Sequence, residues 1–211
     1  MNITIFGASR GVGRAALGLA AARGHTVTAV ARSGDFLAGA AASEIVGDVF
    51  DADLVARALT GAHAVLVALG TSPATREGAQ QAHVCSRGTR VILEAMQAEG
   101  PRRIAVVSSY GVGPTRERRP FPFNIVAATL LKDVMADKEA QERVVRESET
   151  QWTIVQPLGL TDGPATGTPF VSTDGSREVT QVARADVAAV CIEALESGTY
   201  LRETIAISGP K

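Results

Sequence analysis

The segment TIFGASRGVG, from Thr4 to Gly13, is an apolar run followed by three glycines with an arginine among them. Glycines let the backbone turn tightly and approach a bulky anion, and free N–H groups at the start of a helix bind phosphate. A glycine motif alone indicates only a tight turn, but between a strand and a helix it is typical of a dinucleotide site. We therefore expect a pyrophosphate to contact Gly7, Ser9, Arg10, Gly11, Val12 and Gly13.

The end of the second expected strand lacks an acidic residue. About 20 residues after such glycines, NAD-binding sheets usually carry a carboxylate that bonds the ribose hydroxyls, but this chain has Arg32 there. An arginine pairs bidentately with a 2′-phosphate, which a carboxylate would repel, and Arg10 can reach the same group. The two arginines predict a preference for NADPH. The alternative is that both simply face solvent, and Asp35, slightly later, leaves NADH use open.

Further strand ends complete the expected pocket, because ligands of open α/β sheets lie outside the carboxyl ends of the strands. Asp48 and Val49 are expected beside the adenine, ALG at 68–70 beside the central ribose, and the serine pair at 108–109 beside the nicotinamide. Each of these segments on its own could be an ordinary turn. Because such a segment follows each of several successive strands, together they predict a cofactor pocket. The corresponding cofactor contacts are Asp48, Val49, Ala68, Leu69, Gly70, Ser108 and Pro157.

Strand-like and helix-like runs alternate along the chain and position these residues. We expect strands over residues 2–6, 25–31, 44–46, 64–69, 104–107, 152–157 and 204–207. We expect helices over 14–23, from Asp51 or Asp53 to 59, over 78–99 and 124–148, and from an Asp186 cap to 196, with a hairpin around Asp174 and Gly175. This alternation predicts an α/β fold, a Rossmann-type doubly wound parallel sheet with helices on both faces. We expect a single NAD(P)-binding domain over 1–211, to which 157–211 contributes the substrate loops.

Composition limits the classes of function. The chain has 211 residues, 45% of them hydrophobic and 20% charged, and a net charge of −1, which gives no field to hold nucleic acid or an anionic membrane. Cys85 and Cys191 lie far apart in apolar segments, as is typical of reduced thiols rather than of a metal site. No apolar run approaches the ~20 residues that cross a bilayer. We expect a cytoplasmic monomer or homodimer that acts on a small molecule.

Six segments together resemble one family over essentially the whole chain: GASRGVG, GDV, ALGT, VVSSYG, DKEAQERVVRES and WTIVQPLGLTDGP. They are similar to the atypical short-chain dehydrogenase/reductase family, and most of all to its NAD(P)H-binding subgroup of flavin reductase (biliverdin-IXβ reductase), related quinone or azo reductases and NmrA-like proteins. Arg10 replaces the middle glycine of the subgroup's usual turn, so that the turn looks like that of classical members. In those members an arginine at this place commonly accompanies NADPH use.

The resemblance also implies candidate catalytic residues. Family catalysis often uses a Tyr-x-x-x-Lys pair, in which the lysine lowers the pKa of the tyrosine proton donor. Lys138 matches the lysine, but Val134 stands in place of the tyrosine. Lys138 shares a helix face with Val134 and Met135, so we expect it to point toward protein and to contact the cofactor ribose; a snorkelling side chain is the alternative.

Two residues at the nicotinamide end are further candidates. Ser109 matches the serine that faces the nicotinamide in the flavin-reductase branch, whereas Gly159 stands where that branch has a histidine. Tyr110 is the nearby phenol and could act as the proton donor, although neighbours at a strand end point in opposite directions. The expected proton donor of a ketone reductase is therefore missing.

Hydride transfer to a planar conjugated acceptor tolerates this absence, because the incoming charge delocalises and solvent can supply the proton. The sequence thus favours an NADPH-dependent reductase of a flavin, quinone or similar acceptor, oriented by the loops 111–123 and 158–170, with Phe121, Phe123 and Phe170 as apolar walls. One alternative is a redox sensor that binds NADPH without turnover. A weaker one is an epimerase or dehydratase, which usually needs the tyrosine and a larger carboxyl-terminal domain.

Overall fold

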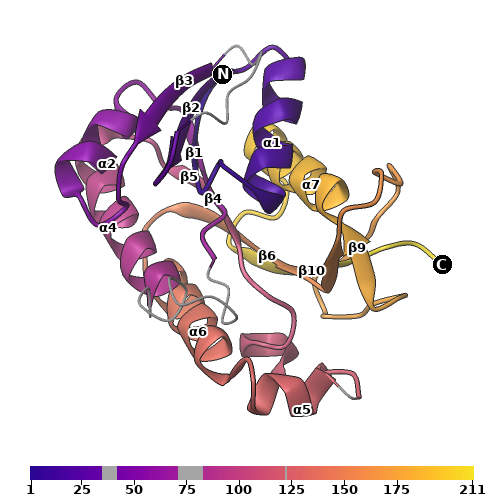
Figure 1. The fold of residues 1–211 in the computed structure, drawn as a ribbon. Coiled ribbons are helices and arrows are strands. Elements are labelled where there is room, and N and C mark those ends of the chain that lie inside the picture. The colour runs from indigo at the N-terminus through magenta and orange to yellow at the C-terminus, as the bar shows by residue number, and fades with distance from the viewer. Residues whose placement is uncertain (35–41, 71–82, 122) are drawn as a thin grey trace.

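The apolar runs form the strands of one central sheet in a computed structural model, which describes residues 1–34, 42–70, 83–121 and 123–211 (Figure 1). The strands are β1 (Asn2–Phe6), β2 (Thr26–Ala31), β3 (Ala42–Val46), β4 (Ala64–Val67), β5 (Arg103–Val107), β6 (Gln151–Pro157), β8 (Phe170–Ser172) and β10 (Glu203–Ser208). Their order in the sheet is β3-β2-β1-β4-β5-β6-β10-β8, and β8 alone among these strands runs antiparallel to its neighbour. A separate parallel pair joins β7 (Gly159–Thr161) to β9 (Gln181–Ala183).

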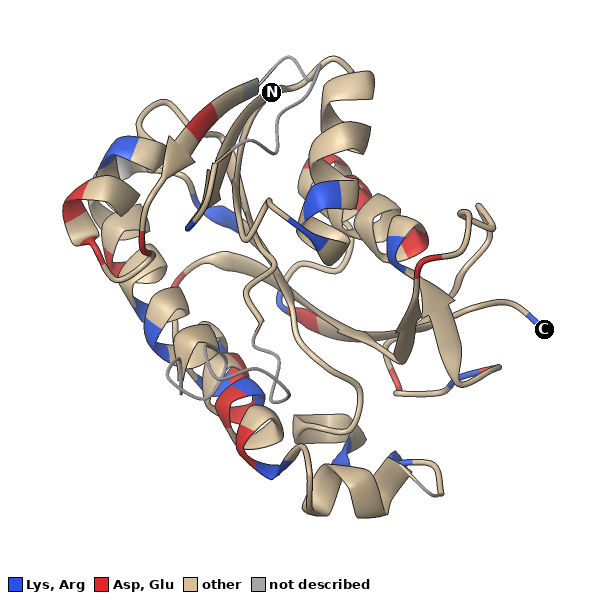
Figure 2. Ribbon diagram, viewed as in Figure 1, with Lys and Arg blue, Asp and Glu red and all other residues tan. Residues whose placement is uncertain are grey.

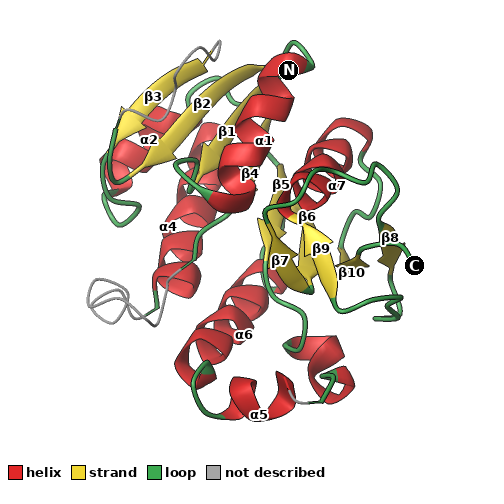
Figure 3. Ribbon diagram, turned by 45° about the vertical axis from the view of Figure 1, so that its right-hand side comes forward, coloured by secondary structure: helices red, strands yellow, loops and turns green. Residues whose placement is uncertain are grey.

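Helices cover both faces of the sheet. They are α1 (Gly11–Ala22), α2 (Ala52–Leu59), α4 (Val84–Glu99), α5 (Phe123–Ala128), α6 (Lys132–Arg146) and α7 (Arg184–Ser197), with a 3-10 helix η1 (Gly113–Arg118). α1 and α7 lie on one face, and α2, α4 and α6 lie on the other (Figures 1 and 3). This arrangement confirms the predicted Rossmann-type doubly wound fold. The predicted cap Asp51 accepts a hydrogen bond from the Leu54 N–H at 3.1 Å, whereas residues 78–82 and Asp35 lie outside the described residues.

The central strand β4 shows why these runs become buried parallel strands. Every residue of its sequence AVLV is fully buried. Ala64 and Leu66 join the core beneath α1 and α7, while Val65 and Val67 join the core beneath α2 and α4. Successive side chains of a strand point to opposite faces, so a strand between two helical layers must be apolar throughout. The same rule leaves only the strand ends for polar chemistry.

The single helix predicted over 124–148 is wrong. The chain forms two helices instead, α5 and α6, with a break at which the Leu131 N–H bonds the Val126 carbonyl at 3.0 Å. The Thr129 hydroxyl donates to the Ile125 carbonyl at 2.8 Å, a local bond that competes with the regular helix pattern. The bend lets α5 and α6 place Ala127 and Met135 in the same small apolar cluster.

The hairpin predicted around Asp174 and Gly175 is also wrong. The residues before it form β8, which pairs with β10 rather than with the chain that follows. The turn itself is present, since the Asp174 carboxylate accepts bonds from the Ser176 N–H at 2.9 Å and the Ser176 hydroxyl at 2.7 Å. These bonds hold the Asp174 pKa below its usual range. The turn could thus be predicted from the local sequence, but the strand that pairs with β8 could not.

Asp186 is not the predicted helix cap. α7 begins at Arg184, and Asp186 lies in its first turn with a side chain that is 1% exposed. Its carboxylate oxygens accept bonds from the Thr166 N–H at 3.0 Å, the Thr166 hydroxyl at 2.9 Å and the Gly167 N–H at 3.0 Å. Asp186 therefore fastens the glycine- and threonine-rich loop after β7 to the helix layer.

Replacing Asp186 with alanine should lower the free energy of unfolding by about 2 kcal/mol, because the N–H and O–H donors of Thr166 and Gly167 would lose a charged partner. Asp186→Asn keeps the shape and one acceptor oxygen, and should cost less. Urea denaturation of the two variants measures the difference. An alanine variant as stable as the parent protein would mean that water replaces the carboxylate and that the loop does not depend on it.

The two cysteines are free and buried. Burial raises the pKa of the Cys191 thiol to about 12, and burial also raises the pKa of Cys85. Thiols of this kind behave as small apolar side chains.

Within the described ranges, no helix has the length and apolar character needed to cross a bilayer, and no cluster of three or more His, Cys, Asp or Glu side chains is arranged to hold a metal.

Candidate cofactor and acceptor site

The glycine turn between β1 and α1 is dictated by close backbone packing. A Cβ at Gly7 would lie 2.6 Å from the Ala68 carbonyl oxygen, and a Cβ at Gly13 would lie 2.1 Å from the Gly7 carbonyl oxygen. Gly7 and Gly11 also have positive φ angles of 86° and 58°. Side chains at Gly7 and Gly13 would push α1 away from β1 and β4. The turn therefore presents the bare backbone of α1's first residues to the space outside the sheet.

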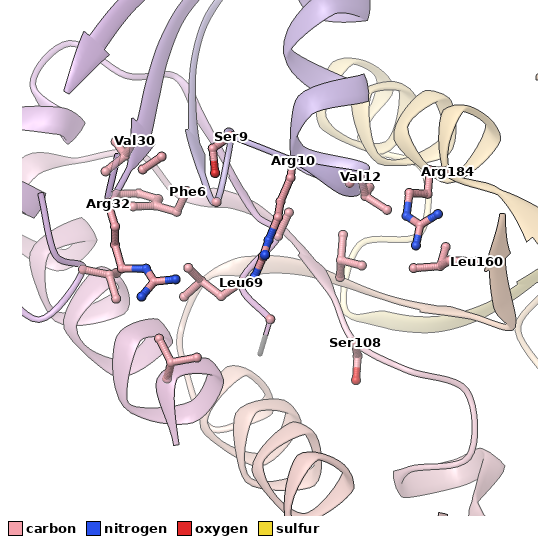
Figure 4. Close-up of a pocket in the computed structure, with 18 of the residues that line it drawn as sticks. Phe6, Ser9, Arg10, Val12, Val30, Arg32, Leu69, Ser108, Leu160 and Arg184 are labelled. Atoms are coloured by element: carbon pink, nitrogen blue, oxygen red, sulfur yellow. The ribbon is translucent and has the colours of Figure 1, made fainter. Parts of the chain in front are cut away.

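A cavity of about 500 Å³ lies along this edge, outside the carboxyl ends of β1 to β5 (Figure 4). It has the size of a cofactor site. Most of the predicted cofactor residues line it: Gly7, Ser9, Arg10, Gly11, Val12, Arg32, Val49, Ala68, Leu69, Gly70, Ser108 and Lys138. The parallel sheet brings them together, because five successive strands end at the same edge.

Three predicted cofactor residues lie outside this cavity. Gly13 is buried against the turn, where it sets the distance between helix and strand. The exposed Asp48 uses its carboxylate to accept the Phe50 N–H at 3.0 Å, and its neighbours on either side line the cavity instead. Pro157 lines the adjoining cavity described below.

Nine residues that line the first cavity were not predicted from the sequence. Most are apolar neighbours of predicted ones, or residues that face them across the cavity, and are Phe6, Val30, Ala31, Gly47, Val84, Val107 and Leu160. The other two are Asp162 and Arg184, whose side chains form an ion pair with Nη1 to Oδ1 at 2.7 Å. Neither carries a local motif, and only the folding of the carboxyl-terminal third brings them to the cavity.

Arginines occupy both ends of the cavity. Figure 4 shows Arg32 at one end, Arg184 at the other, and Arg10 between them. Within the described residues, the side chains of Arg10 and Arg32 form no hydrogen bond or ion pair, so both guanidinium groups are available to a ligand. The one carboxylate among the described lining residues is Asp162, which lies with Arg184 at the far end. The Arg32 end therefore favours an anionic group.

Lys138 comes from α6, on which acidic and basic residues alternate closely (Figure 2). It is 6% exposed, and its Nζ donates to the Leu69 and Val107 carbonyls, both at 2.8 Å, and to Gln141 Oε1 at 2.9 Å. All three ammonium donors are thus used. The side chain points into the protein as predicted and ties the ends of β4 and β5 together beneath the cavity. Its contact with a cofactor ribose stays a prediction.

The Ser108 hydroxyl is held by the buried carboxylate of Glu142, which lies on α6. The hydroxyl donates to Glu142 Oε1 at 2.5 Å, and Gln156 Nε2 donates to the same oxygen at 2.7 Å. Arg146 Nη2 lies 2.7 Å from Glu142 Oε2. Glu142 is 0% exposed, and a buried charge of this kind needs such partners. The network fixes the Ser108 hydroxyl, which faces the cavity with free acceptor capacity.

A second cavity of about 550 Å³ adjoins the first and shares Ser108, Leu160 and Arg184 with it. Its remaining walls come from the chain after β5 and after η1, from α5, α6 and the residue before α6, from the end of β6 and the start of β7, and from the residue before β9. They are Ser109, Tyr110, Pro120, Phe123, Leu131, Val134, Met135, Pro157, Leu158, Gly159 and Thr180. Among the described lining residues, Arg184 is the one charged side chain. The second cavity is therefore an apolar chamber that opens from the Ser108 end of the first.

The candidate catalytic residues Ser109 and Tyr110 both line this second cavity. The Ser109 hydroxyl donates to the Tyr110 carbonyl at 3.3 Å. The Tyr110 hydroxyl is buried and donates to the Gly175 carbonyl at 3.0 Å, so its proton is already in a hydrogen bond. Of the predicted aromatic walls, Phe123 lines the second cavity and the other two line neither of the two cavities: Phe121 is 80% exposed, and Phe170 belongs to β8.

Comparison with known proteins identifies the family. Residues 7–198 match the model of the NAD(P)H-binding family. ChuY, an anaerobillin reductase from Escherichia coli O157:H7, is 26% identical with a TM-score of 0.84, over 100% of this chain and 98% of that chain. The oxidoreductase ylbE from Lactococcus lactis is 20% identical with a TM-score of 0.81, over 100% and 92%. A short-chain dehydrogenase/reductase from Veillonella parvula is 19% identical with a TM-score of 0.80, over 99% and 94%.

The residues of the first cavity fit the cofactor of this family. The backbone of Gly11 is exposed at the start of α1, where a pyrophosphate binds in such folds. The cavity continues past Val49 on one side and Ser108 on the other, as an extended dinucleotide requires. Fold, cavity and family match agree, and the chain belongs to the NAD(P)H-binding family.

Proposed function

We propose that the protein is an NADPH-dependent reductase that transfers hydride to a planar conjugated acceptor such as a flavin or a quinone. One observation carries the proposal: a cofactor cavity with two unengaged arginines at its adenosine end opens, at Ser108, into a mostly apolar chamber. The reductase relative with 26% identity over nearly the whole of both chains supports this reaction class.

The preference for NADPH is supported by charge. Arg32 follows β2 directly, where an NAD-specific protein would place a carboxylate, and Arg10 extends toward the same half of the cavity (Figure 4). A guanidinium matches a phosphate with two parallel hydrogen bonds. The 2′-phosphate of NADPH would thus lie between two cations that have no partner in the described part of the chain.

When NADPH is bound, its dihydronicotinamide supplies a hydride, which is two electrons and one proton, and water supplies the second proton to the reduced acceptor. The protein orients the two partners. Leu158, Met135 and Phe123 provide apolar surface against which a planar acceptor can stack. Ser108, fixed by Glu142, offers its hydroxyl oxygen at the junction of the two cavities. Positioning rather than acid catalysis then gives most of the rate.

The test is to mix purified protein with NADPH and either FMN or a simple quinone, and to follow the near-ultraviolet absorbance of NADPH. Acceptor-dependent oxidation of NADPH is expected. Binding of NADPH without oxidation by any planar acceptor would instead favour a redox sensor, the second candidate, which the engaged Tyr110 hydroxyl fits equally well. Failure to bind NADPH at all would contradict both.

Replacing Tyr110 with phenylalanine should leave kcat for a quinone within about threefold, since the phenol proton is directed to the Gly175 carbonyl and not to the chamber. The variant should lose about 1 kcal/mol of stability, the net value of one hydrogen bond. Steady-state kinetics and urea denaturation measure the two effects. A kcat that falls a hundredfold, with stability unchanged, would make Tyr110 the proton donor.

A further inference from the structure

Arg184 occupies a position that the proposed reaction does not yet use. It is the first residue of α7, and α7 packs against α1 on the same face of the sheet. Its Nε lies 3.7 Å from the point where a Cβ at Gly11 would stand, and its Cδ lies 3.9 Å from that point. The guanidinium therefore sits directly over the start of α1, at the place where a dinucleotide fold binds its pyrophosphate.

The guanidinium is only partly engaged. Its Nη1 bonds Asp162 Oδ1 at 2.7 Å, and the Arg184 side chain is 28% exposed. No other hydrogen bond of Arg184 is made within the described residues, although a guanidinium has five N–H donors. Both side chains line the first cavity. A cation with unused donors thus lies beside the pyrophosphate position, next to Gly11 of the glycine turn.

Asp162 is a weak partner for this cation. Its side chain is 91% exposed, and exposed ion pairs contribute little because water and salt screen them. A pyrophosphate in the cavity would present two negative charges to the same guanidinium, and it would also repel the Asp162 carboxylate. Charge-assisted bonds to phosphate are the stronger choice for arginine.

We infer that Arg184 clamps the coenzyme pyrophosphate at the start of α1, from the side of α7, and that Asp162 is a competing partner which the phosphates displace. This rests on the cofactor assignment within the proposed function, but not on the acceptor. The clamp acts on a group that NADPH and NADH share, unlike the arginines at the adenosine end. It also closes the coenzyme between α1 and α7, beside the junction with the second cavity.

The experiment measures binding without any acceptor, by titrating NADPH, NADH and adenosine 2′-monophosphate into each variant. Arg184→Gln should weaken NADPH and NADH by a similar factor, about tenfold to a hundredfold, the effect of losing a charge-assisted contact. Adenosine 2′-monophosphate has no pyrophosphate, and its affinity should change less than about twofold. Arg184→Lys keeps the positive charge but loses the planar guanidinium that bonds phosphate bidentately, so its coenzyme affinities should lie between those of the parent protein and Arg184→Gln. Asp162→Asn should tighten both coenzymes by about two- to fivefold.

Arg116→Gln is the matched control, because Arg116 also forms an exposed ion pair, with Glu139, but lies outside both cavities. It should bind like the parent protein, and thermal melting checks that every variant is folded. Unchanged coenzyme binding by Arg184→Gln, with a higher KM for the acceptor alone, would assign Arg184 to the second cavity and overturn the clamp. Weaker binding by Asp162→Asn would overturn the displacement. These binding measurements need no acceptor, so they test the clamp even if the protein reduces no acceptor.

Discussion

Replacing Gly13 with alanine is expected to abolish NADPH binding and to lower the free energy of unfolding by about 3 kcal/mol. The new Cβ would lie 2.1 Å from the Gly7 carbonyl oxygen and 2.9 Å from its carbon. Both contacts are to backbone, which cannot rotate away, so α1 must move off the sheet, and overpacking of this kind costs about 1 to 3 kcal/mol. Because Gly7 itself touches the end of β4, the displaced turn would lose the geometry that faces the pyrophosphate.

Gly18→Ala is the control on the same helix. Gly18 is exposed, and nothing lies within 4 Å of a Cβ there, so alanine should stabilise α1 by about 0.5 to 1 kcal/mol. Urea denaturation and NADPH titration of both variants separate packing from helix propensity. Should Gly13→Ala bind NADPH as tightly as the parent protein, the close approach of helix and turn would not determine the cofactor site.

The sheet and its helical layers could be predicted because their signals are local. Apolar runs such as β4 can be buried on both sides only within a parallel sheet, and the glycine turn marks the first strand-to-helix junction. The predictions were wrong where a contact between residues far apart in the sequence determines the secondary structure. Whether α5 and α6 form one helix depends on a shared cluster with Val112, and whether β8 continues into a hairpin depends on β10, some 30 residues away.

The positions of Arg10 and Arg32 at the first cavity were predictable for the same reason, since both residues follow strands whose places in the sheet are fixed. The end of the cavity at Arg184 and Asp162 was not. Arg184 and Asp162 meet the cavity only through the packing of α7 on α1, and no spacing in the sequence encodes that contact. The hydrogen bonds that occupy Tyr110 and Lys138 depend on partners 65 and 69 residues away.

Replacing Arg10 and Arg32 together with alanine should raise the Kd for NADPH at least about tenfold and leave the Kd for NADH within about threefold. Each charge-assisted contact with the 2′-phosphate is worth roughly 1.5 to 3 kcal/mol, and about 1.4 kcal/mol corresponds to a tenfold change. NADH lacks that phosphate, so it loses only the general attraction of two cations. Fluorescence titration with each coenzyme gives the ratio of the two Kd values, and added salt should diminish it.

The pattern across variants distinguishes the two groups of arginines. Arg202→Ala removes an exposed arginine that pairs with Glu149 far from the cavity, and it should change neither Kd. If Arg10→Ala and Arg32→Ala act on one phosphate, their separate effects should not add, because residues that share a partner are coupled. An equal loss for NADPH and NADH would place both side chains on the pyrophosphate, the role inferred for Arg184. No loss for either coenzyme would mean that they face only solvent, and the preference for NADPH would then have no basis in this cavity.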